Sequence, residues 1–99
     1  MRQKAERFDH YLEARLKSPA FRKHFQLARL ATELAHRIAE LRRRQGLTQT
    51  DLAQRMGTKQ QTVCRLERGD YQGFTLKTLL KIAEATKTHL VVDFRRTGS

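Results

Sequence analysis

The sequence predicts an all-α domain, with an N-terminal helical extension before it and a short C-terminal β-strand after it. The chain has 99 residues, enough for one small domain with a single core. Apolar residues recur at helical spacing along most of it, and Gly46, Gly57 and Gly69 stand where helices are expected to stop. A short β-branched run near the end indicates the strand. We therefore expect an extension over residues 1–30, a central domain over 31–88, and a strand with a tail over 89–99.

The N-terminal half predicts long helices. An apolar stripe over Phe8–Lys17 indicates the first helix, and Ser18 followed by Pro19 matches an N-cap and the proline favoured in a first turn. From Pro19 to Gln45 there is no other proline and no glycine, while apolar residues keep the helical period. One long helix, or two helices bent near residues 28–32, fits this stretch.

Two short helices follow Gly46. Thr48 caps the first of them, and Asp51 at the third helical position forms a capping box in a weakened form. That helix ends at Gly57. The second runs from about Lys59 to Arg68, and we expect Thr58 to cap it.

The C-terminal part predicts one more helix and the strand. Asp70–Gly73 is typical of a turn, and Thr75 caps a helix that runs to about Thr86. The strand is Leu90–Phe94. Because it has no evident partner in its own chain, it is a candidate element of a dimer, and the long helix Pro19–Gln45 is the rival candidate.

The balance of charge is strongly basic. The net charge is +11, and residues 42–69 carry seven Lys and Arg against two Asp and Glu. Residues 1–30 carry eight against three. Such charge suits the phosphates of a nucleic acid, although a solvated surface can carry it too.

The cysteine content and the hydropathy of the sequence indicate the cellular compartment of the protein. The single cysteine, Cys64, excludes an internal disulfide, and we interpret it as a small packing residue in a protein of a reducing compartment. No apolar run approaches the roughly 20 residues of a membrane span, and no signal peptide is evident. We expect a cytoplasmic protein with no membrane contact.

The stretch Gln49–Arg68 predicts a helix-turn-helix unit. Ala53 is small where two steeply crossing helices must approach, and Gly57 suits the left-handed turn between them. Leu52, Val63 and Leu66 supply the apolar contacts inside the unit. In such a unit the second helix presents its first turn to the major groove of double-stranded DNA.

The second helix carries residue types that contact base edges. Gln60 and Gln61 can each bond to N6 and N7 of adenine, and Thr62 can touch the methyl group of thymine. Lys59 can reach a phosphate or a guanine, and Arg65 a guanine or the backbone.

Flanking residues predict phosphate contacts. Gln49 and Thr50 stand at the start of the first helix of the unit, where free backbone N–H groups also suit phosphate. Arg68 and Tyr71 follow the second helix. Arg43 ends the preceding helix, where a basic side chain also complements the helix dipole.

The central pattern resembles the XRE/Cro-type helix-turn-helix proteins, which include the lambdoid phage repressors. The resemblance covers about residues 37–88 and implies a lambda-repressor-like five-helix domain. It implies that Gln49 clamps a phosphate and braces Gln60, and that Arg65 reads bases with the glutamines. It also implies that Arg42 and Glu67 form a buried ion pair. The pattern comprises Leu41-Arg42, Gly46-Leu47-Thr48-Gln49, Leu52-Ala53, Gly57, Gln60 and Arg65-Leu66-Glu67-Arg68-Gly69.

The two ends are similar to antitoxins of the HigA kind. The segments are FDHYLEARLKSPAFRKHF before the domain and YQGFTLKTLLKIAEATKTHLVVDF after it. The resemblance implies a repressor of its own operon that neutralises a RelE/ParE-like partner toxin. A stand-alone regulator without a toxin is the alternative. The apolar residues of Phe8–Phe25 either pack on the domain or form a partner surface.

The mechanism of DNA reading predicts a homodimer. One helix-turn-helix module buries too little surface for high specificity, whereas a two-fold dimer reads both halves of a palindromic operator.

No enzyme is expected, since the four histidines are scattered and none pairs with a carboxylate in a recognisable motif. No metal site and no cofactor are expected either, because metal-ligand spacing and a glycine-rich phosphate loop are lacking.

Overall fold

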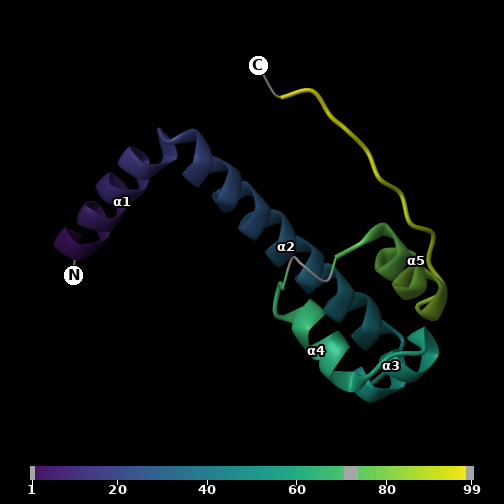
Figure 1. Ribbon diagram of the computed structural model, residues 1–99. Coiled ribbons are helices and arrows are strands. Elements are labelled where there is room, and N and C mark those ends of the chain that lie inside the picture. Colours follow the sequence, from purple (N-terminus) through teal and green to yellow (C-terminus); the bar gives the residue numbers. More distant parts are fainter. Residues whose placement is uncertain (1, 71–73, 98–99) are drawn as a thin grey trace.

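The computed structural model describes residues 2–70 and 74–97, with side chains from residue 7 onward, and within these residues it is all-helical (Figure 1). This confirms the expected all-α class. The helices are α1 (Arg2–Leu16), α2 (Pro19–Arg44), α3 (Gln49–Met56), α4 (Gln60–Glu67) and α5 (Leu76–Ala85).

The long helix α2 is continuous over 26 residues, so the alternative of two bent helices is wrong. Ser18 caps it as expected, accepting a hydrogen bond from the backbone N–H of Phe21 at 3.5 Å. The buried residues of α2 are Ala31, Ala35, Ile38 and Ala39, which lie from the middle of the helix toward its C-terminus. Its first half projects from the domain together with α1 (Figure 1). We call α1 and residues 19–30 the N-terminal arm.

The core is built by α2, α3, α4 and α5. Leu52, Val63 and Leu66, which the sequence assigned to the inside of the two-helix unit, expose at most 1% of their surface. Phe74 and Leu79 pack against this core from the start of α5. The buried cluster comprises Ile38, Leu52, Ala53, Met56, Val63, Leu66, Ile82 and Ala85. Burial of side chains from all four helices fixes α3 and α4 relative to α2.

Besides α2, two further helices, α3 and α5, begin with the expected side-chain caps. Thr48 and Asp51 form a complete capping box, with bonds of 2.9 and 3.0 Å between each side chain and the other residue's backbone N–H. The bond that Asp51 accepts from the Thr48 backbone, followed by the bond to the Thr48 side chain, lowers the pKa of Asp51. Thr75 caps α5 through the N–H of Thr78.

The helices α2, α3, α4 and α5 end in the same way. A residue with positive φ follows each: Gly46, Gly57, Gly69 and Lys87, at +68°, +72°, +86° and +53°. In each case the next N–H bonds to a carbonyl five residues back, at 2.9–3.1 Å. This bond pattern closes the free carbonyls of a helix end and turns the chain sharply. The turn at Gly57 is the one that sets α4 against α3.

Two expectations are wrong. Leu90–Phe94 is not a strand, and no strand occurs in residues 2–70 or 74–97, because a strand needs a ladder of bonds to a second strand. Lys59, not Thr58, is the N-cap residue of α4, and its side chain makes no capping bond. The N–H of Thr58 instead closes the end of α3 on Ala53. Of the expected turn Asp70–Gly73, residues 71–73 lie outside the described part.

Candidate nucleic-acid interface

One face of α4 gathers the polar residues that the sequence singled out. Gln60, Gln61, Arg65 and Arg68 line a shallow surface groove of about 300 Å³, together with Cys64. The opposite face of the helix is held in the core by Val63 and Leu66. Spacing of three and four residues brings the polar side chains onto one side, where they face solvent. The groove therefore carries amide and guanidinium groups at the surface.

The remaining predicted residues lie around this face with different exposures. Lys59 is exposed immediately before α4, and Thr62 is half-buried and does not line the groove. Thr50 and Arg43 are exposed at the start of α3 and near the end of α2. Tyr71 lies outside the described residues.

Arg42 and Glu67 form a two-bonded ion pair between α2 and α4. Arg42 Nε lies 2.7 Å from Glu67 Oε2, and Arg42 Nη2 lies 2.9 Å from Oε1. Their side chains are 13% and 7% exposed. The hydrogen bond to Glu67 raises the pKa of Arg42, which keeps the guanidinium charged. A third bond, from Nη1 to the carbonyl of Leu47 at 2.9 Å, ties the same side chain to the turn before α3.

Gln49 connects this ion pair to the surface. Its Nε2 donates to Glu67 Oε1 at 3.2 Å, and its Oε1 accepts from Gln60 Nε2 at 2.8 Å. A continuous series of hydrogen bonds therefore runs from Arg42 through Glu67 and Gln49 to Gln60. The exposed end of the series is the first residue of α4.

Cys64 and Arg55 have roles that the sequence did not indicate. Cys64 is half-buried and lines the groove with the glutamines, so it belongs to the polar face as well as to the packing. Arg55 donates to the carbonyl of Ala85 at 3.1 Å and thereby binds α3 to the end of α5. Gln45 donates to the carbonyl of Thr86 in the same region. Single polar residues on exposed helix faces gave no pattern from which to infer these contacts.

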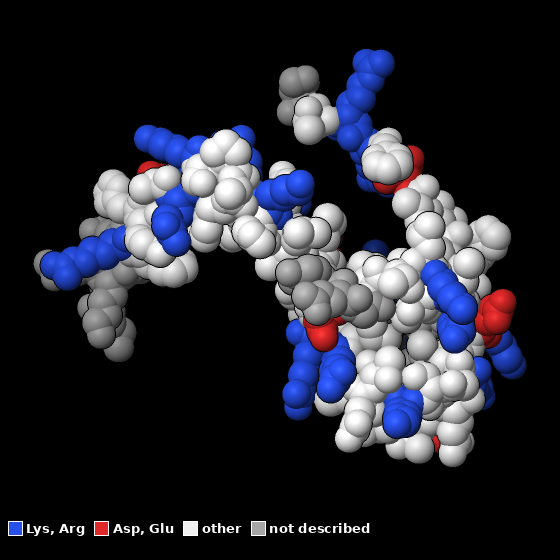
Figure 2. Space-filling view, in the orientation of Figure 1, with Lys and Arg blue, Asp and Glu red and all other residues white. Residues whose placement is uncertain are grey.

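Basic side chains lie on α4 and also along the arm. Figure 2 shows Lys and Arg side chains over α4 and along the N-terminal arm, with few acidic side chains between them. No helix in the described part of the chain is long and apolar enough to cross a membrane. Among the same residues no group of three or more His, Cys, Asp or Glu is placed to hold a metal ion.

Comparison with known proteins agrees with the geometry of the two short helices. A family model described as helix-turn-helix matches residues 38–92, more than half of the chain. No curated protein and no solved structure gives a significant match. The matched range contains α3, α4 and α5 with the end of α2, and it excludes the arm.

Proposed function

The chain belongs to the XRE-type helix-turn-helix family of DNA-binding transcription regulators, and we propose that it is a repressor whose α4 reads bases in the major groove. The observation that carries this proposal is the polar face of α4, where Gln60, Gln61 and Arg65 are exposed side by side. Amides and a guanidinium in this position match the donor and acceptor groups of adenine and guanine. In this proposal Lys59 and Thr62, which lie outside the lining of the groove, add further base contacts.

The phosphate contacts in this proposal come from the rim of the groove. Gln49 and Thr50 stand at the N-terminus of α3, where backbone N–H groups are also available to a phosphate. Arg43 and Arg68 add positive charge on either side. Such contacts fix the register of the protein on DNA, whereas the α4 side chains supply the sequence preference.

Selection from a randomised pool of DNA duplexes tests the reading helix. The wild-type protein should enrich a defined sequence, and Gln60→Ala should relax the preference at one position of each half-site. Gln54→Ala is the matched control, because Gln54 is an exposed glutamine on α3 that does not line the groove. A Gln60→Ala variant with unchanged affinity and unchanged base preference would contradict the assignment.

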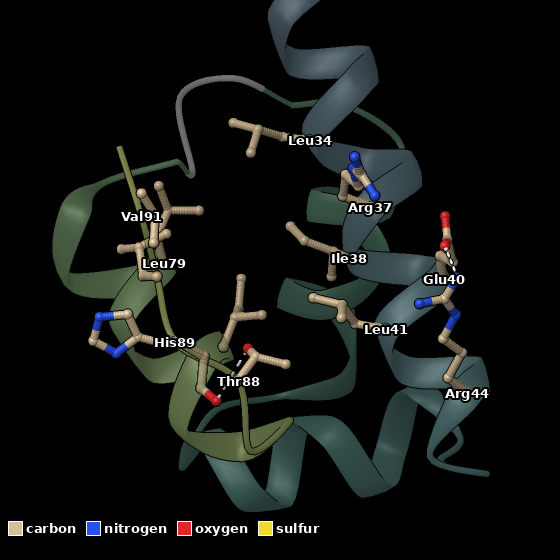
Figure 3. Close-up of a pocket in the computed structure, with 13 residues that line it drawn as sticks. Leu34, Arg37, Ile38, Glu40, Leu41, Arg44, Leu79, Thr88, His89 and Val91 are labelled. Atoms are coloured by element: carbon tan, nitrogen blue, oxygen red, sulfur yellow. Dashed lines mark hydrogen bonds and ion pairs between the residues drawn. The ribbon is translucent and has the colours of Figure 1, made fainter. Parts of the chain in front are cut away.

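We propose further that the protein acts as a homodimer on a palindromic operator, and that residues 90–94 pair between the two copies. Their backbone has no ladder partner in the described part of the chain, and Val91 and Phe94 are 75% and 96% exposed. Beside them, an apolar pocket of about 390 Å³ lies between α2, α5 and the C-terminal segment (Figure 3). Leu34, Ile38 and Leu79 line it. Pairing of two copies would satisfy the open backbone and cover apolar surface together.

Deletion of residues 89–99 tests this arrangement. The shortened chain should be monomeric by light scattering, while circular dichroism should show that its helices persist. An unchanged dimer would reject pairing through residues 90–94 and favour α2 as the dimer element.

We propose that the biological role is that of a HigA-like antitoxin, which represses its own operon and neutralises a RelE/ParE-like toxin. The support is the arm, where Phe8 and Tyr11 are 61% and 56% exposed and Leu30 is 54% exposed. A helical extension that does not pack these side chains on its own domain leaves them available to a partner. The stand-alone regulator remains the second candidate, because the helix-turn-helix match itself excludes the arm.

Co-purification with the product of the adjacent gene distinguishes the two roles. An antitoxin should bring down a small toxin-sized protein, and deletion of residues 1–27 should abolish the complex without loss of DNA binding. The deletion is informative because the buried residues of the described chain begin at Ala31. Absence of any co-purifying neighbour would favour the stand-alone regulator.

We also propose that the chain has no catalytic activity of its own. The groove is lined by amides, guanidinium groups and a thiol rather than by paired acids and bases. A rigorously purified sample should not cleave nucleic acid. Nuclease activity that survives Gln60→Ala and Gln61→Ala would contradict this.

A further inference from the structure

We propose that Glu67 is a positioning residue for base recognition: acting through Gln49, it fixes the direction of the Gln60 side-chain amide and thereby makes the helix select adenine over guanine. The inference rests on the proposed function, in that Gln60 reads a base. It adds a role for a largely buried ion pair that would otherwise serve only to hold α2 and α4 together.

The direction of each bond follows from the chemistry of its atoms. An ionised carboxylate only accepts hydrogen bonds, and Glu67 already accepts two from Arg42. Gln49 must therefore turn its amide nitrogen toward Glu67, at 3.2 Å. This leaves the oxygen of Gln49 facing Gln60, which must turn its own nitrogen inward and donates at 2.8 Å.

The fixed amide of Gln60 keeps one N–H and its oxygen for DNA. Adenine presents an acceptor at N7 and a donor at N6, which this pair of groups matches. Guanine presents acceptors at both N7 and O6, and a free side-chain amide could donate one of its two N–H groups to each of them. Because Gln49 holds one N–H of Gln60, the Gln60 oxygen must face one of the two guanine acceptors, and guanine is rejected.

The burial of the series explains why the direction holds. Glu67 and Arg42 are 7% and 13% exposed, Gln49 is half-buried, and Gln60 is exposed. Exposure increases from the ion pair outward, so the carboxylate sets the orientation of the amides and not the reverse. Ordering Gln60 before DNA arrives also removes part of the entropy cost of binding.

The test compares adenine with guanine at one position of a defined duplex. The probe is the duplex that the wild-type protein selects from a randomised pool, with adenine or guanine at the position whose preference Gln60→Ala removes. Glu67→Gln and Gln49→Met should each reduce the preference for adenine about tenfold, the scale of one good base contact. The ratio between the two duplexes is measured, because Gln49→Met also weakens a phosphate contact in both.

A double variant separates positioning from folding. If Glu67 acts through Gln49, the double variant should lose no more preference than Gln49→Met alone, although Glu67→Gln should lower the free energy of unfolding in either background. Should Glu67→Gln fail to fold, Glu67→Asp takes its place, because it keeps the negative charge and shortens the reach of the carboxylate toward Gln49. An unchanged adenine preference in the Glu67 variant or in Gln49→Met, or additive losses in the double variant, would overturn the proposal.

Nuclear magnetic resonance of the full-length protein without DNA gives a second readout. The side-chain amide signals of Gln60 should shift in Gln49→Met and in Glu67→Gln, although Glu67 does not bond to Gln60. A Gln60 amide signal that is the same in wild type and in both variants would show that Glu67 does not orient Gln60 through Gln49, even if Gln60 reads a base. If the signal shifts in both variants but Gln60→Ala leaves the base preference unchanged, the orientation of Gln60 is correct and its assignment as a base-reading residue is wrong.

Discussion

The ion pair of Arg42 and Glu67 lets one residue-scale effect be predicted with a sign and a size. Arg42→Met should lower the free energy of unfolding by about 3–5 kcal/mol, because it leaves a largely buried carboxylate without its partner. Urea denaturation measures the loss. Arg43→Met, one residue along the same helix end and exposed, should change stability little.

Replacing both partners separates the attraction between the two charges from the free-energy cost of burying them. Arg42→Met combined with Glu67→Met should recover most of the lost stability, since no uncompensated charge remains. If the double variant were as unstable as Arg42→Met, the loss would reflect packing of the arginine side chain instead.

Lys87 provides a residue-scale prediction in the opposite direction. It holds φ at +53° at the end of α5, where α2, α3 and α4 each have glycine. A left-handed backbone costs a non-glycine residue about 1–2 kcal/mol, while glycine costs about 0.5–1 kcal/mol through the unfolded chain. Lys87→Gly should therefore stabilise the protein by roughly 0.5 kcal/mol. Thermal unfolding measures it, with Lys81→Gly inside α5 as a destabilising control; a stability loss at Lys87 would contradict the strain argument.

The contacts of single polar residues could be predicted from the sequence only in part. The resemblance to the helix-turn-helix family implied the contact of Arg42 with Glu67 and the bracing of Gln60 by Gln49, and both are present. The bond from Gln49 to Glu67 was not foreseen, because its partners are 18 residues apart and no local pattern requires it. Contacts of that kind depend on the packing angle between helices, which residue types alone do not define.

At the scale of the element, the start of α3 yields a prediction with a pH dependence. Thr48→Ala removes the side-chain cap and should lower the free energy of unfolding by about 1 kcal/mol at neutral pH.

The bonds from Thr48 lower the pKa of Asp51, so the charged carboxylate stabilises the folded state above the usual Asp pKa. That contribution is lost as the pH falls through the lowered value. The difference in unfolding free energy between wild type and Asp51→Asn should therefore shrink in acid, and a difference that is constant between neutral and acidic pH would contradict this.

Helix boundaries could be predicted wherever a residue type carries the physical cause. Thr48, Thr75 and Ser18 act as caps, and the glycines end α2, α3 and α4. The end of α5 shows the limit, because Lys87 adopts the same left-handed turn with no glycine to announce it. The strand predicted at Leu90–Phe94 is absent for a different reason. A β-branched composition gives a preference for extended backbone, whereas a strand forms only beside a second strand.

At the scale of the whole molecule, part of the positive charge lies away from the surface proposed to bind DNA. The first 27 residues carry seven Lys and Arg against three acidic residues, a net +4. They belong to the arm, which leaves the domain near Ala31. The end of α4 also lies there, since a Cβ at Gly69 would be 3.7 Å from the Ala31 carbonyl oxygen. The first turn of α4, which carries Gln60 and Gln61, lies at the opposite end of that helix.

We therefore expect the salt dependence of operator binding to be insensitive to the arm. Each cation on a phosphate contributes about −0.9 to the slope of log K against log salt concentration. Lys59→Ala should make the slope of a homodimer shallower by roughly 2, one contact in each copy, if Lys59 binds phosphate. Gln60→Ala should leave the slope unchanged. Deletion of residues 1–27 should also leave it unchanged despite the loss of net positive charge. Fluorescence anisotropy with the selected duplex at several salt concentrations measures all four slopes. A shallower slope after the deletion would mean that the arm lies on the DNA, and its exposed apolar residues would then need another explanation than a protein partner.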